Sequence, residues 1–277
     1  MLIRRLFMFV ILLGGAGLAW GYVGAVADPE IRRASIALPG WPANSPPLRA
    51  LLISDIHIAG PDMPPGRLAD IVTTMNRLEP DIVLIAGDLV SDKMVATRTY
   101  SLADAVAPLA RLMPRIGTFA VLGNHDHWRD AAEARRALKA AGVTVVDNEA
   151  VQAGPLAIGG LDDAFTHHED LAVTLAAMRR LPGARLMLSH SPDPFPDLPS
   201  DVPLMLAGHT HCGQIRLPLI GALSTMSRYG ERYACGLVRE NGKTLITGAG
   251  LGTSILPLRI GAPPDIWLIE IRSDAGR

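Results

Sequence analysis

The residues best suited to metal chemistry stand directly after short apolar runs. Five such segments follow one another along the chain: Ser54-Asp55-Ile56-His57, Gly87-Asp88, Gly123-Asn124-His125-Asp126, Ser189-His190-Ser191 and Gly208-His209-Thr210-His211. The spacings Asp-x-His and His-x-His can aim alternate side chains of an extended segment at one centre. Carboxylate and imidazole together suit Mn, Fe, Zn or similar divalent ions better than Ca or Mg, which prefer oxygen ligands. The residue types therefore predict metal-dependent chemistry.

Strand-length apolar runs, which must position these residues, alternate with helical patterns. The runs are 50–53, 82–86, 119–122, 156–160, 186–188 and 204–207, and the helical patterns are 67–78, 102–112, 131–141 and 171–181. This alternation predicts one layered α/β domain whose strands are covered on both faces. Because ligands bind outside the carboxyl ends of strands in open α/β sheets, the five polar segments can converge on one site. Three later strand patterns without intervening helices, 236–238, 245–247 and 266–271, predict an antiparallel closure.

The motifs D-x-H, G-D, G-N-H-D, H and G-H-T-H, in this order, resemble those of the calcineurin-like metallophosphoesterase superfamily over roughly residues 49–272. The stretch 208–218, with G-L-G-T-S at 250–254 and Pro264-Asp265, is similar to a membrane-associated phosphodiesterase branch, the YaeI- and YkuE-like proteins. That branch usually has glycine after the second histidine of G-H-T-H, where this chain has Cys212. We expect Cys212 to be a tolerated small neighbour of the site and not a ligand.

The resemblance implies a four-layer α/β/β/α sandwich with a two-metal site at one edge of its two sheets. The implied metal ligands are Asp55, His57 and His211 for one ion, Asn124, His190 and His209 for the other, and Asp88 between them. A shared carboxylate partly neutralises two cations, which lie about 3.5–4 Å apart in such sites. Mn is the first choice for both ions, with Fe, Zn, Ni or Co as alternatives.

Two residues beside the implied ligands have proposed catalytic roles. His125 is expected to protonate the leaving group or to stabilise the phosphoryl oxygens, and Asp126 to orient its imidazole.

Other polar residues are open to two interpretations. Asp162 and Asp163 could enter the site, but paired aspartates after a strand usually form a turn or a helix cap. His127 and Trp128 fit either the wall of a substrate pocket or packing at a helix start. Arg259 could bind phosphate, against the default of a surface charge.

The N-terminus has the layout of a signal anchor or a signal peptide. Residues 6–27 carry no charge and follow Arg4 and Arg5, and a helix of about 20 apolar residues can span a bilayer. We favour a single-pass anchor in the bacterial cytoplasmic membrane. The small residues of Ala25-Val26-Ala27 keep open cleavage and export to the periplasm or envelope. Arg4 and Arg5 favour a cytoplasmic N-terminus, but Arg32 and Arg33 reduce the charge bias.

The chain is therefore divided into an anchor or signal at 1–27, a proline-rich linker at 28–48 and the catalytic domain at 49–277. With 49% hydrophobic and 19% charged residues, the domain can bury a sizeable core. The formal charge of −1 argues against a nucleic-acid partner. The two cysteines, Cys212 and Cys235, are expected to be unconnected buried thiols, with a disulfide as the less favoured alternative.

The leading hypothesis is a metal-dependent hydrolase of phosphodiester or pyrophosphate bonds with a lipid-linked or envelope substrate. Because relatives of the branch that it resembles include such enzymes, the pyrophosphate bond of UDP-2,3-diacylglucosamine in lipid A synthesis is one candidate. A domain outside the cytoplasm would favour a periplasmic phosphodiester instead. A broad-specificity phosphodiesterase or phosphatase is the second enzyme hypothesis. The non-enzyme alternative is a metal-binding scaffold, which the complete set of ligand residues argues against.

Overall fold

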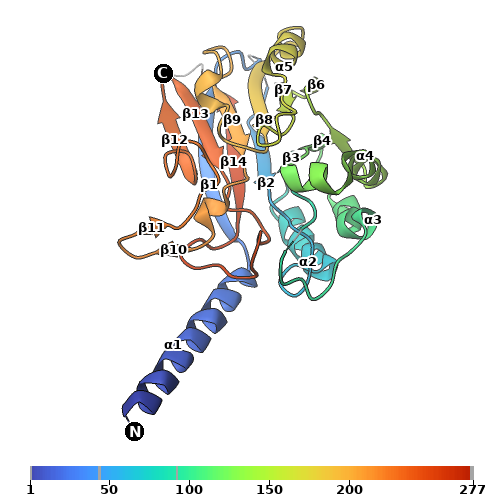
Figure 1. Cartoon of the computed structure of the whole chain (residues 1–277). Coiled ribbons are helices and arrows are strands. Elements are labelled where there is room, and N and C mark those ends of the chain that lie inside the picture. Colours follow the sequence, from blue (N-terminus) through green and yellow to red (C-terminus); the bar gives the residue numbers. More distant parts are fainter. Residues whose placement is uncertain (1, 43–44, 92, 275–277) are drawn as a thin grey trace.

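The computed structural model describes residues 2–42, 45–91 and 93–274, and two six-stranded sheets form its centre (Figure 1). In spatial order, the first sheet contains β1 (Glu30–Leu38), β14 (Asp265–Ser273), β2 (Leu48–Ile53), β3 (Ile82–Ala86), β4 (Gly117–Val121) and β5 (Val143–Val145). The second contains β12 (Gly236–Glu240), β13 (Lys243–Thr247), β9 (Leu204–Ala207), β8 (Ala184–Ser189), β7 (Leu156–Leu161) and β6 (Glu149–Ala153). A separate hairpin consists of β10 (Arg216–Leu217) and β11 (Gly221–Ala222).

Helices connect and cover the strands. They are α1 (Leu2–Ala25), α2 (Pro65–Asn76), α3 (Leu102–Val106), α4 (Asn124–Ala140) and α5 (Leu171–Met178), with 3-10 turns at Ala107–Arg111, Phe195–Asp197 and His211–Gly213. The predicted helix at 131–141 is only the second part of α4, because Asp130 has an extended backbone (φ −177°, ψ 96°) that kinks the helix. The earlier part carries the G-N-H-D motif.

The burial of alternate strand residues on opposite sides creates the layers. In β3, Ile82 and Leu84 join the core between the two sheets, whereas Val83 and Ile85 pack beneath α2, α3 and α4. A third core lies on the outer side of the second sheet, where Met178 of α5 is buried. The predicted four-layer α/β/β/α sandwich is confirmed.

The antiparallel closure predicted for the last strands is only part of the observed arrangement. β14 runs antiparallel to β2 but parallel to β1, and β13 runs antiparallel to β12 but parallel to β9. The central pairs β2–β3–β4 and β7–β8–β9 are parallel. Their carboxyl ends therefore lie along common edges, as a convergent site requires.

The prediction of a linker over 28–48 is wrong for its first half. Glu30–Leu38 forms β1, which pairs along its whole length with β14 from the end of the chain. Its burial alternates over the last residues, with Ile36 and Leu38 in the core between the sheets. The prolines of this segment flank β1 but do not interrupt it, because Pro29 precedes the strand and Pro39 is the first proline after it. The folded domain therefore begins well before residue 49.

The predicted free thiols are also wrong, because Cys212 and Cys235 form a disulfide. Their Cα atoms lie 4.6 Å apart, within the usual span of a disulfide. The segment between them leaves the His211 turn, forms the β10–β11 hairpin and returns beside it before β12 begins. A single pair of cysteines 23 positions apart gives no sign in the sequence that the chain returns in this way.

Helix α1 projects from one end of the domain (Figure 1). It is long and apolar enough to cross a membrane. Its last turns are attached to the domain: Arg259 donates a backbone hydrogen bond to the Gly21 carbonyl (2.8 Å), and the Arg67 guanidinium donates to the carbonyl of Ala25 (3.0 Å). A side chain at Gly24 would collide with the Arg259 carbonyl.

Candidate metal centre

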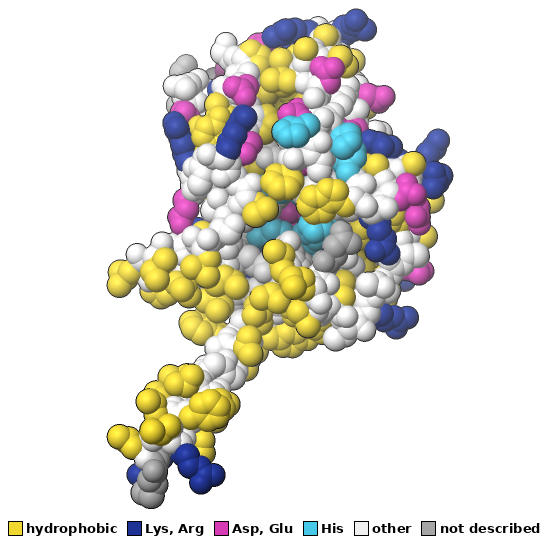
Figure 2. Space-filling model, viewed as in Figure 1, with side chains coloured by type: hydrophobic (Ala, Val, Ile, Leu, Met, Phe, Trp, Pro, Cys, Tyr) yellow, Lys and Arg dark blue, Asp and Glu magenta, His cyan; other side chains and the backbone are white. Residues whose placement is uncertain are grey.

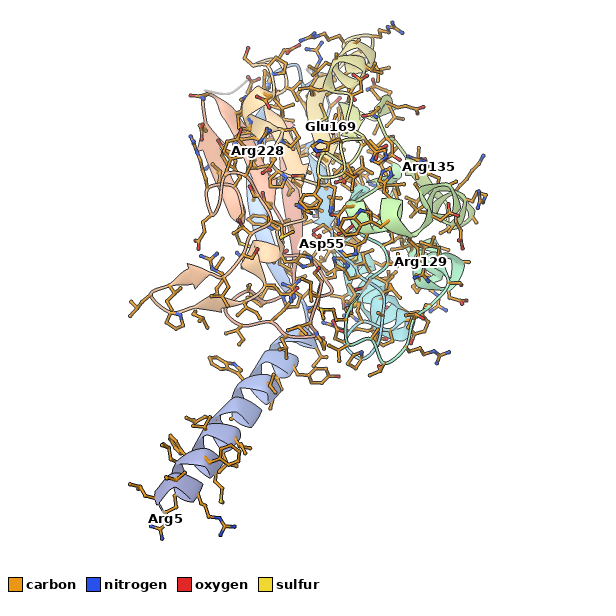
Figure 3. All side chains as sticks on the ribbon, in the orientation of Figure 1. Arg5, Asp55, Arg129, Arg135, Glu169 and Arg228 are labelled. Carbon is orange, nitrogen blue, oxygen red and sulfur yellow. A yellow bond between two sulfur atoms is a disulfide. The ribbon has the colours of Figure 1, made fainter. Side chains whose placement is uncertain are left out.

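The five polar segments meet where strands of both sheets end. Asp55 and His57 follow β2, Asp88 follows β3, and Asn124 follows β4. The second sheet supplies His190 after β8 and His209 and His211 after β9. Asp55 lies at the junction of the two sheets (Figure 3). The structure therefore brings together all seven residues predicted to be ligands.

The backbone at these residues is unusually constrained. Five of the seven have φ in the left-handed region, namely Asp55 (48°), His57 (47°), Asp88 (57°), His209 (70°) and His211 (51°). This conformation is uncommon for residues other than glycine, and such outliers concentrate at functional sites. Cys212 is also left-handed (53°), which gives a physical reason why glycine suits this position.

Two of the glycines provide room for carboxylates. A Cβ atom on Gly123 would collide with Asp88, and one on Gly208 would collide with Asp55. These two glycines therefore allow the strand ends to close around the carboxylates.

One group of ligand atoms comes from Asp55, His57 and His211. The Nε2 atoms of His57 and His211 lie 3.0 Å apart, and Asp55 Oδ1 lies 3.5 Å from His211 Nε2. The backbone N–H of His209 donates to the Asp55 carboxylate at 3.0 Å and so fixes its orientation. All three side chains are buried.

Asp88 lies between this group and the next. Its Oδ2 atom is 3.4 Å from His57 Nε2 and 3.3 Å from His190 Nε2, while its Oδ1 atom accepts a hydrogen bond from the His125 backbone (2.9 Å). One carboxylate oxygen therefore faces both groups of histidines. This geometry is the one expected of a bridging ligand.

The second group contains Asn124, His190 and His209. His190 Nε2 lies 3.1 Å from both Asn124 Oδ1 and His209 Nδ1. The opposite ring nitrogens of the two histidines donate to carbonyls, His190 Nδ1 to Ala86 (2.7 Å) and His209 Nε2 to Met226 (3.2 Å). In the neutral rings, the two facing nitrogens would both present lone pairs. A metal ion between them would accept both lone pairs, so the arrangement fits a metal site.

The electrostatics favour neutral imidazoles at three positions. Burial, the largest cause, lowers the pKa of His57 and of His211 well below the ordinary value, and it lowers that of His209 to about 4. Neutral imidazole is the form that binds metals. Burial also opposes the charged forms of His190 and Asp88, but their mutual attraction prevails: the pKa of His190 is raised and that of Asp88 is lowered. Positive charge is therefore favoured beside Asp88.

His125 lies at the edge of this centre, and Asp126 lies beneath it. The His125 ring is in edge contact with the His57 ring, at a centroid distance of 4.8 Å. The Asp126 carboxylate accepts backbone hydrogen bonds from Asp88, Leu89 and Gly123 at 2.9–3.0 Å. These contacts assign Asp126 to holding the Asp88 loop, a different role from the predicted orientation of the His125 ring.

The structure shows the surroundings of Asp162 and Asp163, for which the sequence allowed two interpretations. Asp163 accepts hydrogen bonds from Phe165 and Thr166 in a turn, as the turn interpretation predicts. Asp162 instead pairs with His127 (2.7 Å), which lies away from the ligands.

Arg259 is fully buried and donates to the carbonyls of residues 249, 250, 252 and 262, so it is not a surface charge. Its guanidinium also lies 3.3 Å from His211 Nδ1. Arg259 therefore organises the loop behind the centre.

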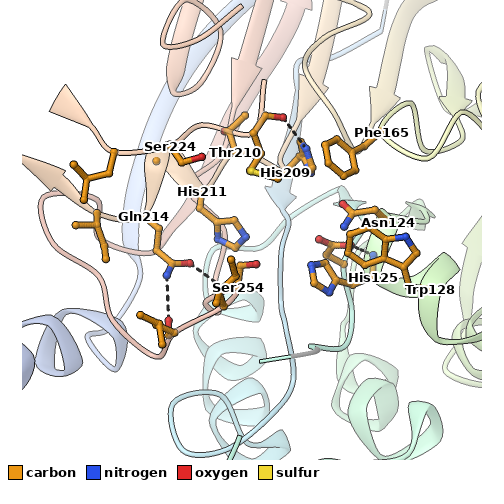
Figure 4. Close-up of a pocket in the computed structure, with 17 residues that line it drawn as sticks. Asn124, His125, Trp128, Phe165, His209, Thr210, His211, Gln214, Ser224 and Ser254 are labelled. Carbon is orange, nitrogen blue, oxygen red and sulfur yellow. Dashed lines mark hydrogen bonds between the residues drawn. The ribbon is translucent and has the colours of Figure 1, made fainter. Parts of the chain in front are cut away.

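The centre opens into a cavity of about 350 Å³ (Figure 4). Aromatic side chains form one wall, where the Phe165 ring lies 4.7 Å from that of His209 and Trp128 contacts both His125 and Phe165. The lining also includes apolar residues of two loops: Ile215, Leu223, Met226, Ile255 and Leu256. Apart from Trp128, none of these wall residues was predicted to line a cavity, because apolar side chains in loops follow no clear period.

Comparison with known proteins is consistent with this geometry. Residues 48–213 match the calcineurin-like phosphoesterase family. Metallophosphoesterase YkuE of Bacillus subtilis is 33% identical over 217 residues, covering 74% of this chain and 73% of that protein. Phosphodiesterase YaeI of Escherichia coli is 32% identical over 238 residues, covering 82% and 83%.

A vertebrate protein is similar over a larger part of this chain. The transmembrane protein with metallophosphoesterase domain of Danio rerio is 28% identical over 272 residues, or 91% of this chain, which spans 60% of that protein. Among solved structures, nuclease MPE of Pseudomonas putida covers 79% of this chain and 86% of its own at 20% identity, with a TM-score of 0.38.

Proposed function

This chain belongs to the calcineurin-like phosphoesterase family, and from that premise we propose that it is a binuclear metal-dependent phosphodiesterase anchored in a membrane by α1. The observation that carries the proposal is the position of Asp88, whose Oδ2 atom faces His57 on one side and His190 on the other. One carboxylate shared between two histidine groups has a clear use when each group holds a cation.

Asp55, His57 and His211 would hold one ion, and Asn124, His190 and His209 the other, with Asp88 common to both. When bound, the ions would supply Lewis-acid activation of the phosphoryl group and a lowered pKa for the attacking water. The mixed N and O ligands suit Mn, Fe, Zn, Ni or Co, and Mn is our first choice.

The side chains around the metal centre would position the substrate and donate a proton to the leaving group. The backbone N–H of His125 holds the Asp88 carboxylate, and the His125 side chain lines the cavity beside the ligands. From there its imidazole would protonate the leaving oxygen as the ester bond breaks. Trp128 and Phe165 would orient the group attached to the phosphate and exclude water from that side.

The apolar cavity walls favour a substrate that carries an apolar group, and α1 favours one located in a membrane. The Danio rerio relative is named a transmembrane protein, which supports the same interpretation of α1. The attachment of Gly21 and Ala25 to the domain supports a retained anchor over a cleaved signal. We therefore propose a lipid-linked phosphodiester as the substrate.

The disulfide supports an extracytoplasmic position of the domain, because disulfides persist in oxidising compartments. Arg4 and Arg5, at the other end of α1, support the same orientation through the positive-inside rule. A cytosolic nucleotide-sugar lipid such as UDP-2,3-diacylglucosamine would not reach a domain on that side. The orientation therefore favours a phosphodiester of the outer leaflet or envelope over that pyrophosphate.

Hydrolysis of bis(p-nitrophenyl) phosphate and p-nitrophenyl phosphate by the detergent-solubilised full chain tests the proposal, with added Mn²⁺, with chelator and with Asp88→Asn. We expect Mn²⁺-dependent turnover that is faster for the diester and is lost in Asp88→Asn. Faster turnover of the monoester would make this chain a phosphatase. Failure of the folded, metal-loaded protein to hydrolyse either compound or a phosphodiester lipid would favour the non-catalytic scaffold.

A further inference from the structure

An exposed apolar surface lies on the side of the domain from which α1 emerges. Figure 2 shows hydrophobic side chains gathered below the histidines of the metal centre and along the projecting β10–β11 hairpin. We define the apolar rim as six exposed residues: Met94, Val95, Leu219, Ile220, Leu223 and Ile255. No charged residue occurs in the two loop segments that carry four of them, 217–227 and 249–258.

The tip of the β10–β11 hairpin exposes apolar side chains to solvent. Leu219 is fully exposed and Ile220 is 69% exposed. Leu219 also has a φ of 65°, a conformation in which a branched side chain is strained and glycine or asparagine would be favoured. Exposure to water and the left-handed backbone both disfavour leucine here. An apolar side chain at this position therefore indicates that the hairpin tip contacts an apolar surface.

A continuous set of contacts attaches the rim to α1. Arg259 donates its backbone N–H to the Gly21 carbonyl of α1, and the next residue, Ile260, bridges to Ile215 at the base of the hairpin. The Arg216 N–H donates to the Ile260 carbonyl at 2.8 Å. The orientation of the rim relative to α1 is therefore fixed by backbone hydrogen bonds.

Aromatic residues mark the level of the membrane surface on α1. Trp20 is 66% exposed and Tyr22 is 37% exposed, and both lie at the domain end of the helix. Trp and Tyr are enriched where a membrane-spanning helix leaves the hydrocarbon. The rim is connected to the helix at the same level, because Gly21, which contacts residues 258–260, lies between Trp20 and Tyr22 in the sequence.

We propose that the apolar rim inserts into the same bilayer that α1 enters, so that the cavity opens directly to the lipid. Leu223 and Ile255 belong to both the rim and the cavity wall, which joins the membrane surface to the metal centre. An acyl chain could thus pass from the bilayer along an apolar path while its phosphate reaches the ligands. The insertion depends on α1 entering the bilayer but not on hydrolytic activity.

A label at the hairpin tip tests the proposal in the full chain. Leu219→Cys and, as the matched control, Val173→Cys are labelled with an environment-sensitive fluorophore and reconstituted in phosphatidylcholine and phosphatidylglycerol vesicles. Val173 is also apolar and exposed (52%), and it lies on α5, at the opposite end of the domain from α1 (Figure 1). The native cysteines are paired with each other, so the label is specific.

We expect a blue shift at Leu219 and quenching by lipids that carry a nitroxide on the acyl chain, with neither effect at Val173. Emission at Leu219 that matches Val173 would overturn the proposal. A blue shift without lipid quenching would also overturn it, because it would indicate a second copy of the chain at the rim.

Charged variants separate this proposal from the proposed activity. Leu219→Asp should lose the membrane contact of the tip, with hydrolysis of soluble bis(p-nitrophenyl) phosphate unchanged, because Leu219 does not line the cavity. If the tip inserts into the bilayer but the protein hydrolyses no substrate, the proposal about the apolar rim stands and only the proposed function is rejected.

Discussion

The Nε2 atoms of His57 and His211 lie 3.0 Å apart, although 154 positions separate these residues in the sequence. They come from different sheets, β2 and β9, whose carboxyl ends meet at the same edge of the sandwich. Burial keeps both rings neutral, since it lowers their pKa values well below the ordinary value. Two neutral imidazoles directed at one point are therefore the structural basis of one proposed metal site.

Metal removal should destabilise the protein. Without cations, Asp55, Asp88 and several neutral histidines are buried close together, and a ligand that binds only the folded state stabilises it by mass action. At a metal concentration 100 times Kd, the contribution would be about 2.7 kcal/mol per site. We expect chelation to lower the unfolding temperature and Mn²⁺ to restore it. An unfolding temperature insensitive to chelator would contradict metal binding at this centre.

Replacement of His125 should separate catalysis from metal binding. Loss of a general acid typically costs about 10²–10⁴-fold in rate. We expect His125→Ala to lower kcat by that order while metal content stays at the wild-type level. His127→Ala is the control, because the His127 ring pairs with Asp162 away from the ligands. Loss of bound metal in His125→Ala would instead identify His125 as a ligand.

Replacement of Asp126 should weaken the fold around Asp88. The Asp126 carboxylate accepts three backbone hydrogen bonds, and leaving a buried donor unsatisfied costs about 1–3 kcal/mol. Asp126→Ala should lower the free energy of unfolding in urea by at least that amount. Asp70→Asn, an exposed site on α2, is the control and should leave it unchanged. Equal stability of the two variants would reject the structural role of Asp126.

The disulfide should be present in the protein extracted from membranes. Cys212 and Cys235 should resist a thiol-specific reagent until a reductant is added, because an extracytoplasmic domain is oxidised. The double variant Cys212→Ser, Cys235→Ser should lose about 2–4 kcal/mol of stability. Free thiols in freshly extracted, otherwise folded protein would place the domain on the cytoplasmic side.

The sequence predicted the parts of the fold that depend on local patterns. Ile82–Ala86 is uniformly apolar and forms β3 over the predicted residues, and the polar segments that follow five of the predicted strands converge as expected. The same patterns do not report pairings between distant segments. β1 was not predicted, because it is half-exposed and is flanked by prolines. Its pairing partner β14 lies at the other end of the chain, so no local pattern reports the pairing.

The same limit applies to individual side chains. Arg259 gave no sign of burial, since its partners are carbonyls of loops that only the complete fold brings together. Phe165 lines the cavity because a turn stabilised by Asp163 places the Phe165 ring beside His209. Both positions depend on tertiary structure, whereas the proposed ligands could be recognised by residue type and order.

The most direct test of the two-metal centre is the metal content of the purified full chain, measured by mass spectrometry against protein concentration. The account predicts about two equivalents of divalent ion for the wild type, a loss in Asp88→Asn, and about one in His190→Ala, since the His57 group remains intact. His168→Ala, an exposed histidine, should match the wild type. A wild-type chain that retains at most one ion after incubation with Mn²⁺, or a His190→Ala variant that keeps both, would contradict the account.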